Sequence, residues 1–259
     1  MINQINHRKF YMDEVSSDGL YKLSEIHSHC KEYNEKITYS EELFSQRFTE
    51  SLTLEEWLYD YEYNDERALL QEMINQWSAS TDDTTGNVIF IGFVEDYETV
   101  TCLKQYVDRR RIMLAKTSHW KNFMDLLYPC FPYLSFSIHI GDGIKKIKDL
   151  RNYASYITHD LIVLNDDGYH IYFEKKEEPA SALREIKARV LDCCNDPKHK
   201  NQLCFLFYSD NHEQLSLCCQ NHTKIKRKDS DVRIYFCWPQ PNVKQGENIL
   251  IGHIGQHPY

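Results

Sequence analysis

Three residues near the middle of the chain have the types and order of a metal-dependent nuclease centre. Asp160 precedes Glu174, and Glu174-Lys175-Lys176 follows the stretch HIYF. Two carboxylates can hold Mg²⁺ through oxygen ligands, and a lysine can polarise the attacking water or the phosphate. The alternative is a solvated surface, because charged runs are common where a strand meets a loop. The nuclease hypothesis makes Asp160, Glu174 and Lys176 catalytic candidates, with Mg²⁺ as the cofactor in that case alone.

Two histidines, His253 and His257, lie in the sequence ILIGHIGQH near the C-terminus. An imidazole titrates near neutral pH and can act as a general acid or base on a strained phosphate without a metal. A structural interpretation requires less, because Gly252 and Gly255 permit a bulge or a close backbone approach and the histidines finish the edge of a strand. We favour the structural interpretation and keep both histidines as candidate contact residues.

Two clusters of basic residues could bind the phosphate backbone of a nucleic acid. They comprise Lys104, Arg109, Arg110, Arg111, Lys116 and Lys121 around an expected helix, and Lys224, Lys226, Arg227 and Lys228 before the expected strand RIYFCW, which carries Arg233 and Tyr235. If the clusters converge, aromatic side chains of that strand could stack on bases. The alternatives are a solvated face, because three consecutive arginines cannot share one face of a helix, and an acidic protein partner.

The nine cysteines lack the spacing of a structural zinc site. Such sites use pairs such as Cys-x-x-Cys, whereas Cys193-Cys194 and Cys218-Cys219 are adjacent and would point to opposite faces of a strand. We therefore expect no bound metal, and reduced thiols that fill the core as small apolar groups.

The charge of the chain is divided unevenly. Residues 1–100 carry 7 Lys and Arg against 21 Asp and Glu, a net charge of −14, whereas residues 101–259 carry 23 against 18, a net charge of +5. This asymmetry suits a basic face for nucleic acid with an acidic part for a protein partner, and equally two parts that dock on each other. The first residues lack a signal-peptide pattern, and no apolar run approaches the ~20 residues that span a bilayer. We expect a cytoplasmic protein without a membrane partner.

The elements that would position these residues indicate an α+β fold, with a helical N-terminal part, a mixed middle and antiparallel C-terminal strands. Residues 1–79 have the pattern of an acidic helical region, in which Thr53 and Asn64 are expected helix caps. Residues 80–87 have the composition of a loop or linker. Residues 88–259 form the expected α+β domain, which starts with a buried strand and ends in a basic β-hairpin.

Within that domain the expected elements are a helix from Tyr97 to Ala115, a strand from Tyr133 to Ile140, a helix from Ile144 to Leu164, a turn at Asp167-Gly168 and a strand from Tyr169 to Phe173. From Gln202 onward, four strand-like runs, LCFLFY, LSLCCQ, VRIYFCW and NILIGHI, are separated by polar turns. The fourth run should pair with the third through a loop at 239–247, where prolines cost no ladder hydrogen bond.

Three stretches, DERALLQEMI, YPCFPYLSFS and VRIYFCWPQPNVKQGENILIGHIGQH, resemble a group of bacterial proteins encoded beside toxin, restriction or phage-defence genes on mobile elements. The shared features correspond to Asp65–Ile74, Phe131–Phe136 and Gly252–His257 of this chain. The resemblance implies a bacterial cytoplasmic component of a defence or toxin system that works with another protein. It carries no catalytic residues.

These observations favour an accessory, partner-binding subunit of a bacterial antiphage defence or toxin–antitoxin system. Its expected partners are another protein of the same operon and, in addition, DNA or RNA. The alternatives are the metal-dependent effector nuclease and an immunity or antitoxin protein whose acidic N-terminal part binds a basic toxin.

Overall fold

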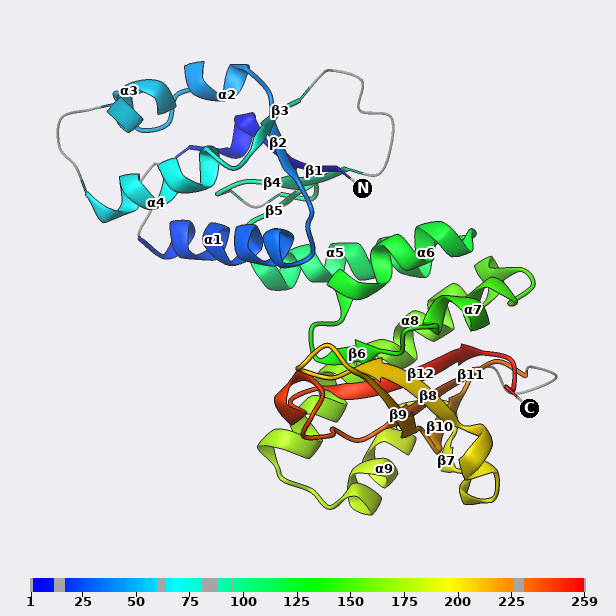
Figure 1. Ribbon diagram of the computed structural model, residues 1–259. Coiled ribbons are helices and arrows are strands. Elements are labelled where there is room, and N and C mark those ends of the chain that lie inside the picture. The colour runs from blue at the N-terminus through cyan, green and yellow to red at the C-terminus, as the bar shows by residue number, and fades with distance from the viewer. Residues whose placement is uncertain are drawn as a thin grey trace. The chain divides into compact units, whose positions relative to one another are not determined.

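The chain forms two compact units, Met1–Arg110 and Arg111–Tyr259, each described here by itself. The computed structural model describes residues 2–11, 17–59, 64–80, 88–94, 96–225 and 231–258. Helices and mixed sheets make up the described chain, and its last strands are antiparallel, which confirms the predicted α+β fold (Figure 1). Among the described residues, no helix is long and apolar enough to cross a membrane.

A sheet of five parallel strands, in the order β3-β2-β1-β4-β5, forms the centre of the first unit. The strands are β1 (Ile2–Ile5), β2 (Ile37–Tyr39), β3 (Ser78–Ala79), β4 (Val88–Ile91) and β5 (Thr99–Val100). Parallel neighbours require crossover connections, which helices supply between β1 and β2 and between β2 and β3. The helices are α1 (Ser17–Glu32), α2 (Glu42–Ser45), α3 (Leu54–Tyr59), α4 (Asp65–Ile74) and the start of α5 (Leu103–Ala115).

Local sequence signals set the starts of two of these helices, as expected. The Asn64 side chain accepts the backbone N–H of Arg67 at 2.8 Å and caps α4. Before α3, the Thr53 hydroxyl accepts the N–H of Glu56, and the Glu56 carboxylate accepts the N–H of Thr53. This reciprocal pair is a capping box.

The first unit extends beyond the loop at 80–87 at which we expected the division of the chain. Residues 81–87 lie outside the described chain, but β4, which follows them, pairs in parallel with β1 along its whole length, from Ile2 opposite Val88 to Ile5 opposite Ile91. The strand is therefore the neighbour of β1 in the centre of the acidic part, and the division falls inside α5. Strand pairing between distant segments cannot be read from local composition.

A second sheet, in the order β6-β12-β11-β10-β7, forms the centre of the second unit. Its strands are β6 (Leu134–Phe136), β7 (Cys193–Asn195), β10 (Asn221–Lys224), β11 (Arg233–Cys237) and β12 (Ile249–Gly255), and a separate hairpin consists of β8 (Cys204–Tyr208) and β9 (Gln214–Cys218). The predicted pairing of the last two runs is confirmed, because β11 and β12 are antiparallel neighbours.

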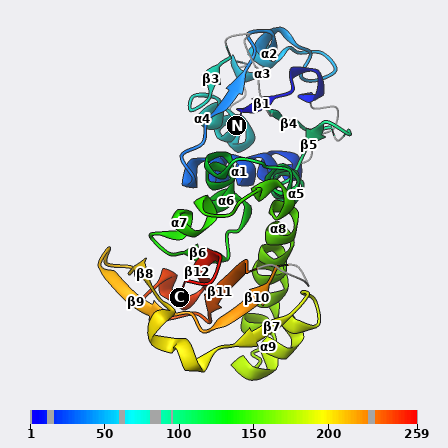
Figure 2. The ribbon, with the colours of Figure 1, turned by 90° about the vertical axis from the view of Figure 1, so that its right-hand side faces the viewer.

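The two faces of this second sheet are covered differently (Figure 2). Side chains alternate along a strand, so Ile234 and Phe236 of β11 join the core beneath the helices, whereas Tyr235 joins a smaller apolar cluster beneath the β8–β9 hairpin. The helices of this unit are α6 (Trp120–Leu127), α7 (Ile140–Lys145), α8 (Ala154–Ile162) and α9 (Pro179–Lys187).

Several predicted elements of the middle region are wrong. The segment expected as a turn and strand continues α8 as π-helical turns, Val163–Gly168 and His170–Glu174. Gly168 lies at the end of the first of these runs rather than in a hairpin. A Cβ on it would lie 2.9 Å from the Ile249 side chain, so its small size allows the helix and the sheet to approach. Likewise the expected strand at 133–140 ends at Phe136, and the expected helix at 144–164 is interrupted before α8.

The expectation of reduced thiols is wrong for one pair of cysteines. Cys204 and Cys218 lie directly opposite each other on β8 and β9 and form a disulfide. The other seven cysteines are not part of a disulfide. The sequence did not predict this disulfide, because the two cysteines are close only through the register in which β8 pairs with β9.

Candidate functional site

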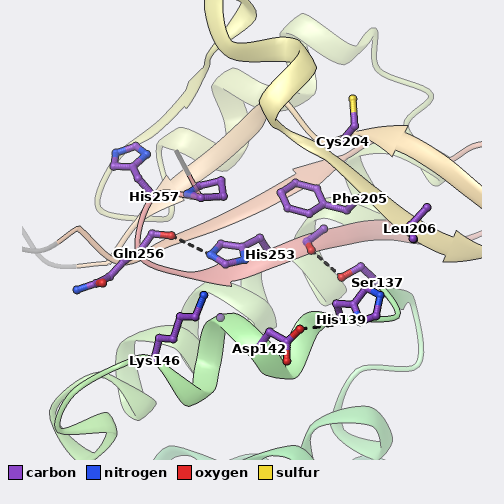
Figure 3. A pocket seen from close by; sticks show the side chains of 13 residues that line it. Ser137, His139, Asp142, Lys146, Cys204, Phe205, Leu206, His253, Gln256 and His257 are labelled. Carbon is purple, nitrogen blue, oxygen red and sulfur yellow. Dashed lines mark hydrogen bonds and ion pairs between the residues drawn. The ribbon is translucent and has the colours of Figure 1, made fainter.

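A cleft of about 530 Å³ lies in the second unit, where α7 approaches the ends of β8 and β12 (Figure 3). Its polar and aromatic lining includes His139, Asp142, Lys146, Phe205, His253 and His257. Two of these residues, His253 and His257, belong to the terminal motif that the sequence singled out. The others come from segments far away along the chain.

A β-bulge aims His253 into this cleft. Tyr235 of β11 lies opposite His253, but the next residue, Phe236, lies opposite Ile251, so Gly252 is the extra residue of β12. A bulge lets two successive residues face the same side of a sheet. Gly252 and His253 both contact the Phe205 ring as a result. A bulge is one of the two outcomes that we expected Gly252 to permit.

The His253 ring is held on several sides by neighbouring groups. It stacks on Phe205, with ring centroids 5.9 Å apart and planes inclined by 11°. Its Nε2 lies 2.8 Å from the carbonyl oxygen of Gln256. Since a carbonyl can only accept, Nε2 carries the proton and donates it. Burial, aided by the charge of Lys146, lowers the pKa of His253.

Two glycines let the backbone close on this ring. A Cβ on Gly143 of α7 would lie 2.9 Å from Nδ1 of His253, and closer still to its Cε1 atom and to the carbonyl oxygen of Ile254. A Cβ on Gly255 would lie 2.9 Å from Nε2 of His253. Both ring nitrogens therefore face backbone, which favours a positioning role for His253 over proton transfer to a ligand.

His257 is held by a buried hydroxyl. Its Nδ1 lies 2.6 Å from the Tyr235 hydroxyl, and Tyr235 is fully buried. Burial, together with the charge of Arg233, lowers the pKa of His257. Tyr235 thus orients His257 from beneath, and its ring is not exposed for stacking on a base.

Two exposed polar side chains next to α7 also line the cleft. Lys146 is exposed, and its side chain extends toward His253 and Gln256 (Figure 3). His139, exposed on the rim, lies 3.9 Å from the Asp142 carboxylate. His139, Asp142 and Lys146 were not among the candidate residues that the sequence suggested. The nearest sequence signal is the Gly-Asp-Gly spacing at 141–143. Without the tertiary structure, this spacing does not distinguish a turn from a short helix.

The three residues of the nuclease hypothesis have different surroundings. Asp160 is buried on α8, 3.2 Å from Nδ1 of His159, and burial raises its pKa. Glu174 is exposed and hydrogen-bonded to His170, and Lys176 follows it at a positive φ of 55°. Glu174 ends a helical run rather than the expected strand, three to four turns (roughly 20 Å) beyond Asp160. Across the described ranges, no group of three or more His, Cys, Asp or Glu side chains could hold a metal ion.

The arginines of the first basic cluster point in different directions. Arg110 is fully buried in the first unit and makes a bidentate ion pair with Glu35. In the second unit, Arg111 makes another with Asp166. Arg109 donates to the carbonyl oxygen of Tyr97, and Lys116 is exposed. Arg110 and Arg111 therefore stabilise the fold. This agrees with the expectation that three consecutive arginines cannot share one face of a helix.

The second basic cluster is described only in part. Lys224 pairs with Asp192, an ion pair that raises the pKa of the lysine. Arg233 is half-buried, and its charge lowers the pKa of His222 and His257. The remaining members, Lys226, Arg227 and Lys228, lie outside the described residues.

Comparison with known proteins adds no relative: no protein-family model, no curated protein and no solved structure matches this chain. The fold and the cleft define an α+β protein of two units with a histidine-lined cleft in the second. Function must be argued from the cleft itself.

Proposed function

We propose that the second unit binds a single strand of nucleic acid in the cleft beside β12. The observation that carries this proposal is the combination of the exposed Lys146, the imidazoles of His139 and His257, and the stacked Phe205 in one cleft. The lysine ammonium group neutralises a phosphate, the imidazoles offer hydrogen bonds, and an aromatic ring offers a stacking surface to any base. A cleft of about 530 Å³ has room for a nucleotide unit but not for a duplex.

Further positive charge adjoins the cleft on α6 and α7. The ammonium groups of Lys121 and Lys145 lie 5.9 and 5.5 Å from the centre of the Trp120 ring. Lys145 precedes Lys146 in the chain, so the basic surface continues from the cleft toward α6. Such a strip supports a path for the phosphates on either side of the bound nucleotide.

Binding is favoured over catalysis because of how His253 is packed. A general base needs a ring nitrogen within hydrogen-bonding reach of the proton that it removes. One nitrogen of His253 is engaged by Gln256 and the other faces the backbone of α7. The metal-dependent nuclease hypothesis remains the alternative, with Asp160, Glu174 and Lys176 as its residues.

The proposal extends to the cellular context that the terminal motif implies. We place the protein in the cytoplasm of a bacterium, as an accessory subunit of a defence or toxin system that acts with a protein of the same operon. Support comes from the resemblance of Gly252–His257 to that group. In this chain, Gly252 and Gly255 allow other groups to pack closely around His253.

Fluorescence anisotropy with labelled 20-nucleotide single-stranded RNA, single-stranded DNA and duplex DNA tests the binding proposal. Lys146→Glu should weaken single-strand binding by about tenfold or more and lower the salt slope by about 1, because one phosphate contact is lost. Lys244→Glu is the matched control, because Lys244 is an exposed lysine of the same unit outside the cleft. Equal affinity of Lys146→Glu and the parent chain for the strand would refute the proposal.

The same preparations test the alternatives. RNA and DNA incubated with Mg²⁺ or with EDTA should stay intact if the protein only binds. Cleavage that needs Mg²⁺ and is lost in Glu174→Ala would instead establish the nuclease. Co-purification with the products of neighbouring genes tests the partner.

A further inference from the structure

A second hollow, of about 270 Å³, lies in the first unit at the carboxyl edge of its parallel sheet. Its walls are formed by the segment that directly follows β1 and by the segment that follows α2, the short helix after β2. His7, Arg8 and Tyr11 follow β1, and residues 46–49 follow β2 and α2. All strands of this sheet are parallel, so their carboxyl ends meet at this one edge.

The described lining of this hollow is basic and polar in a strongly acidic unit. It consists of His7, Arg8, Tyr11, Gln46, Arg47 and Thr49, without a carboxylate. Residues 1–100 carry a net charge of −14, so two arginines beside one small hollow make its charge opposite in sign to that of the surrounding unit. Within the described part of the first unit, neither Arg8 nor Arg47 is paired with a carboxylate.

Buried aromatic rings fix both walls. Phe10 precedes Tyr11, Phe48 follows Arg47, and their rings pack 5.9 Å apart in the core. The wall after β2 is further held as a tight turn, in which Phe48 N–H donates to Leu52 O at 2.9 Å and Leu54 N–H donates to Gln46 O at 3.1 Å. The two segments that present the arginines are therefore pre-organised.

His7 ties the two walls to each other. Its Nε2 lies 3.1 Å from the Glu42 carboxylate at the start of α2, and its Nδ1 lies 3.2 Å from the Ser40 hydroxyl at the end of β2. Both ring nitrogens are thus engaged. The two guanidinium groups remain the ligand-facing charges of the hollow.

The geometry points to a binding site for a small phosphate ester of nucleotide size, with Arg8 and Arg47 as its phosphate ligands. Guanidinium groups recognise phosphate oxygens through paired hydrogen bonds, and both arginines line the hollow at the carboxyl end of β1. The volume of about 270 Å³ suits a phosphate with its sugar and leaves a base at the mouth. This site is independent of the nucleic-acid cleft, because it is built wholly from residues of the first unit.

Isothermal titration calorimetry on the full chain with AMP, ADP, ATP and adenosine tests the assignment. The phosphorylated probes should bind and adenosine should not. The double variant Arg8→Gln, Arg47→Gln should bind them at least about tenfold more weakly. Lys22→Gln is the matched control, because Lys22 is an exposed lysine of α1 away from the hollow, and it should retain parental affinity.

Two further measurements keep the test independent of the variants and of the cleft. Inorganic phosphate should displace AMP from the unmodified chain, whatever the double variant does to folding. Lys146→Glu should bind the nucleotides like the parent chain, which separates this site from the proposed function. The assignment is overturned if the parent binds no phosphorylated probe at millimolar concentration, or if the folded double variant or adenosine matches the affinity of the parent for AMP.

Discussion

A pair of alanine substitutions in α7 tests how closely the helix must approach β12. A Cβ on Gly143 would press on the His253 ring and on the carbonyl oxygen of Ile254, whereas the atoms nearest to a Cβ on Gly141 belong to Met124 and lie 3.6 Å away or more. The first set of neighbours includes the backbone of β12, which is paired with β11, and the second is one flexible side chain. The same substitution should therefore have opposite effects two residues apart.

The expected magnitudes follow from two opposing contributions. Replacing glycine by alanine inside a helix stabilises it by up to about 1 kcal/mol. Overpacking a core contact costs about 1–3 kcal/mol, and the upper part of that range applies to Gly143 because the backbone of β12 cannot rotate away. We expect Gly143→Ala to lower the free energy of unfolding by about 2 kcal/mol and Gly141→Ala to raise it by up to about 1 kcal/mol.

Urea unfolding followed by far-UV circular dichroism measures both effects, provided that the slope with denaturant matches the parent. Because Gly143→Ala also displaces His253, it should weaken binding of the nucleic-acid strand, whereas Gly141→Ala should not. The reasoning about the cleft is refuted if Gly143→Ala is as stable as Gly141→Ala.

Three further predictions concern buried ionisable groups. Arg110→Ala should destabilise the first unit by about 3–5 kcal/mol, since it leaves the Glu35 carboxylate without its buried partner, and a double-mutant cycle with Glu35→Ala in urea should show strong non-additivity. Burial raises the pKa of Asp160, so Asp160→Asn should increase stability above the unfolded-state pKa near 4 and lose that advantage below it. Thermal unfolding of the variant and the parent chain at pH 7 and pH 3 measures this difference. A variant less stable than the parent at pH 7 contradicts the prediction. Burial lowers the pKa of His253, so its contribution to stability is present above the unfolded-state pKa of about 6.5 and is lost as the pH falls. His253→Gln should therefore make the free energy of unfolding decline less steeply between pH 7 and pH 5. An unchanged slope would count against this explanation.

Signals that act over a few residues were predictable from the sequence. Helix caps at Thr53 and Asn64 depend on side chains that bond to backbone within one turn, and both are present. Four of the five described strands after Gln202, namely β8, β9, β11 and β12, were predicted from apolar runs between polar turns, whereas β10 (Asn221–Lys224) was not. The glycine at 252 indicated that a bulge or a close backbone approach was possible there. The sequence also indicated His253 and His257 as candidate contact residues, and both line the cleft.

Features that join distant segments were decided by the tertiary structure alone. Burial of Ile171 under the second sheet kept the segment at 169–173 helical, although its apolar residues suit a strand equally well. Arg110 and Arg111 look like surface charge in the sequence, and only the fold supplies Glu35 and Asp166 as their partners. The cleft beside His253 likewise exists only because Lys146 and Phe205, more than fifty residues apart, are brought together by packing, which no local pattern encodes.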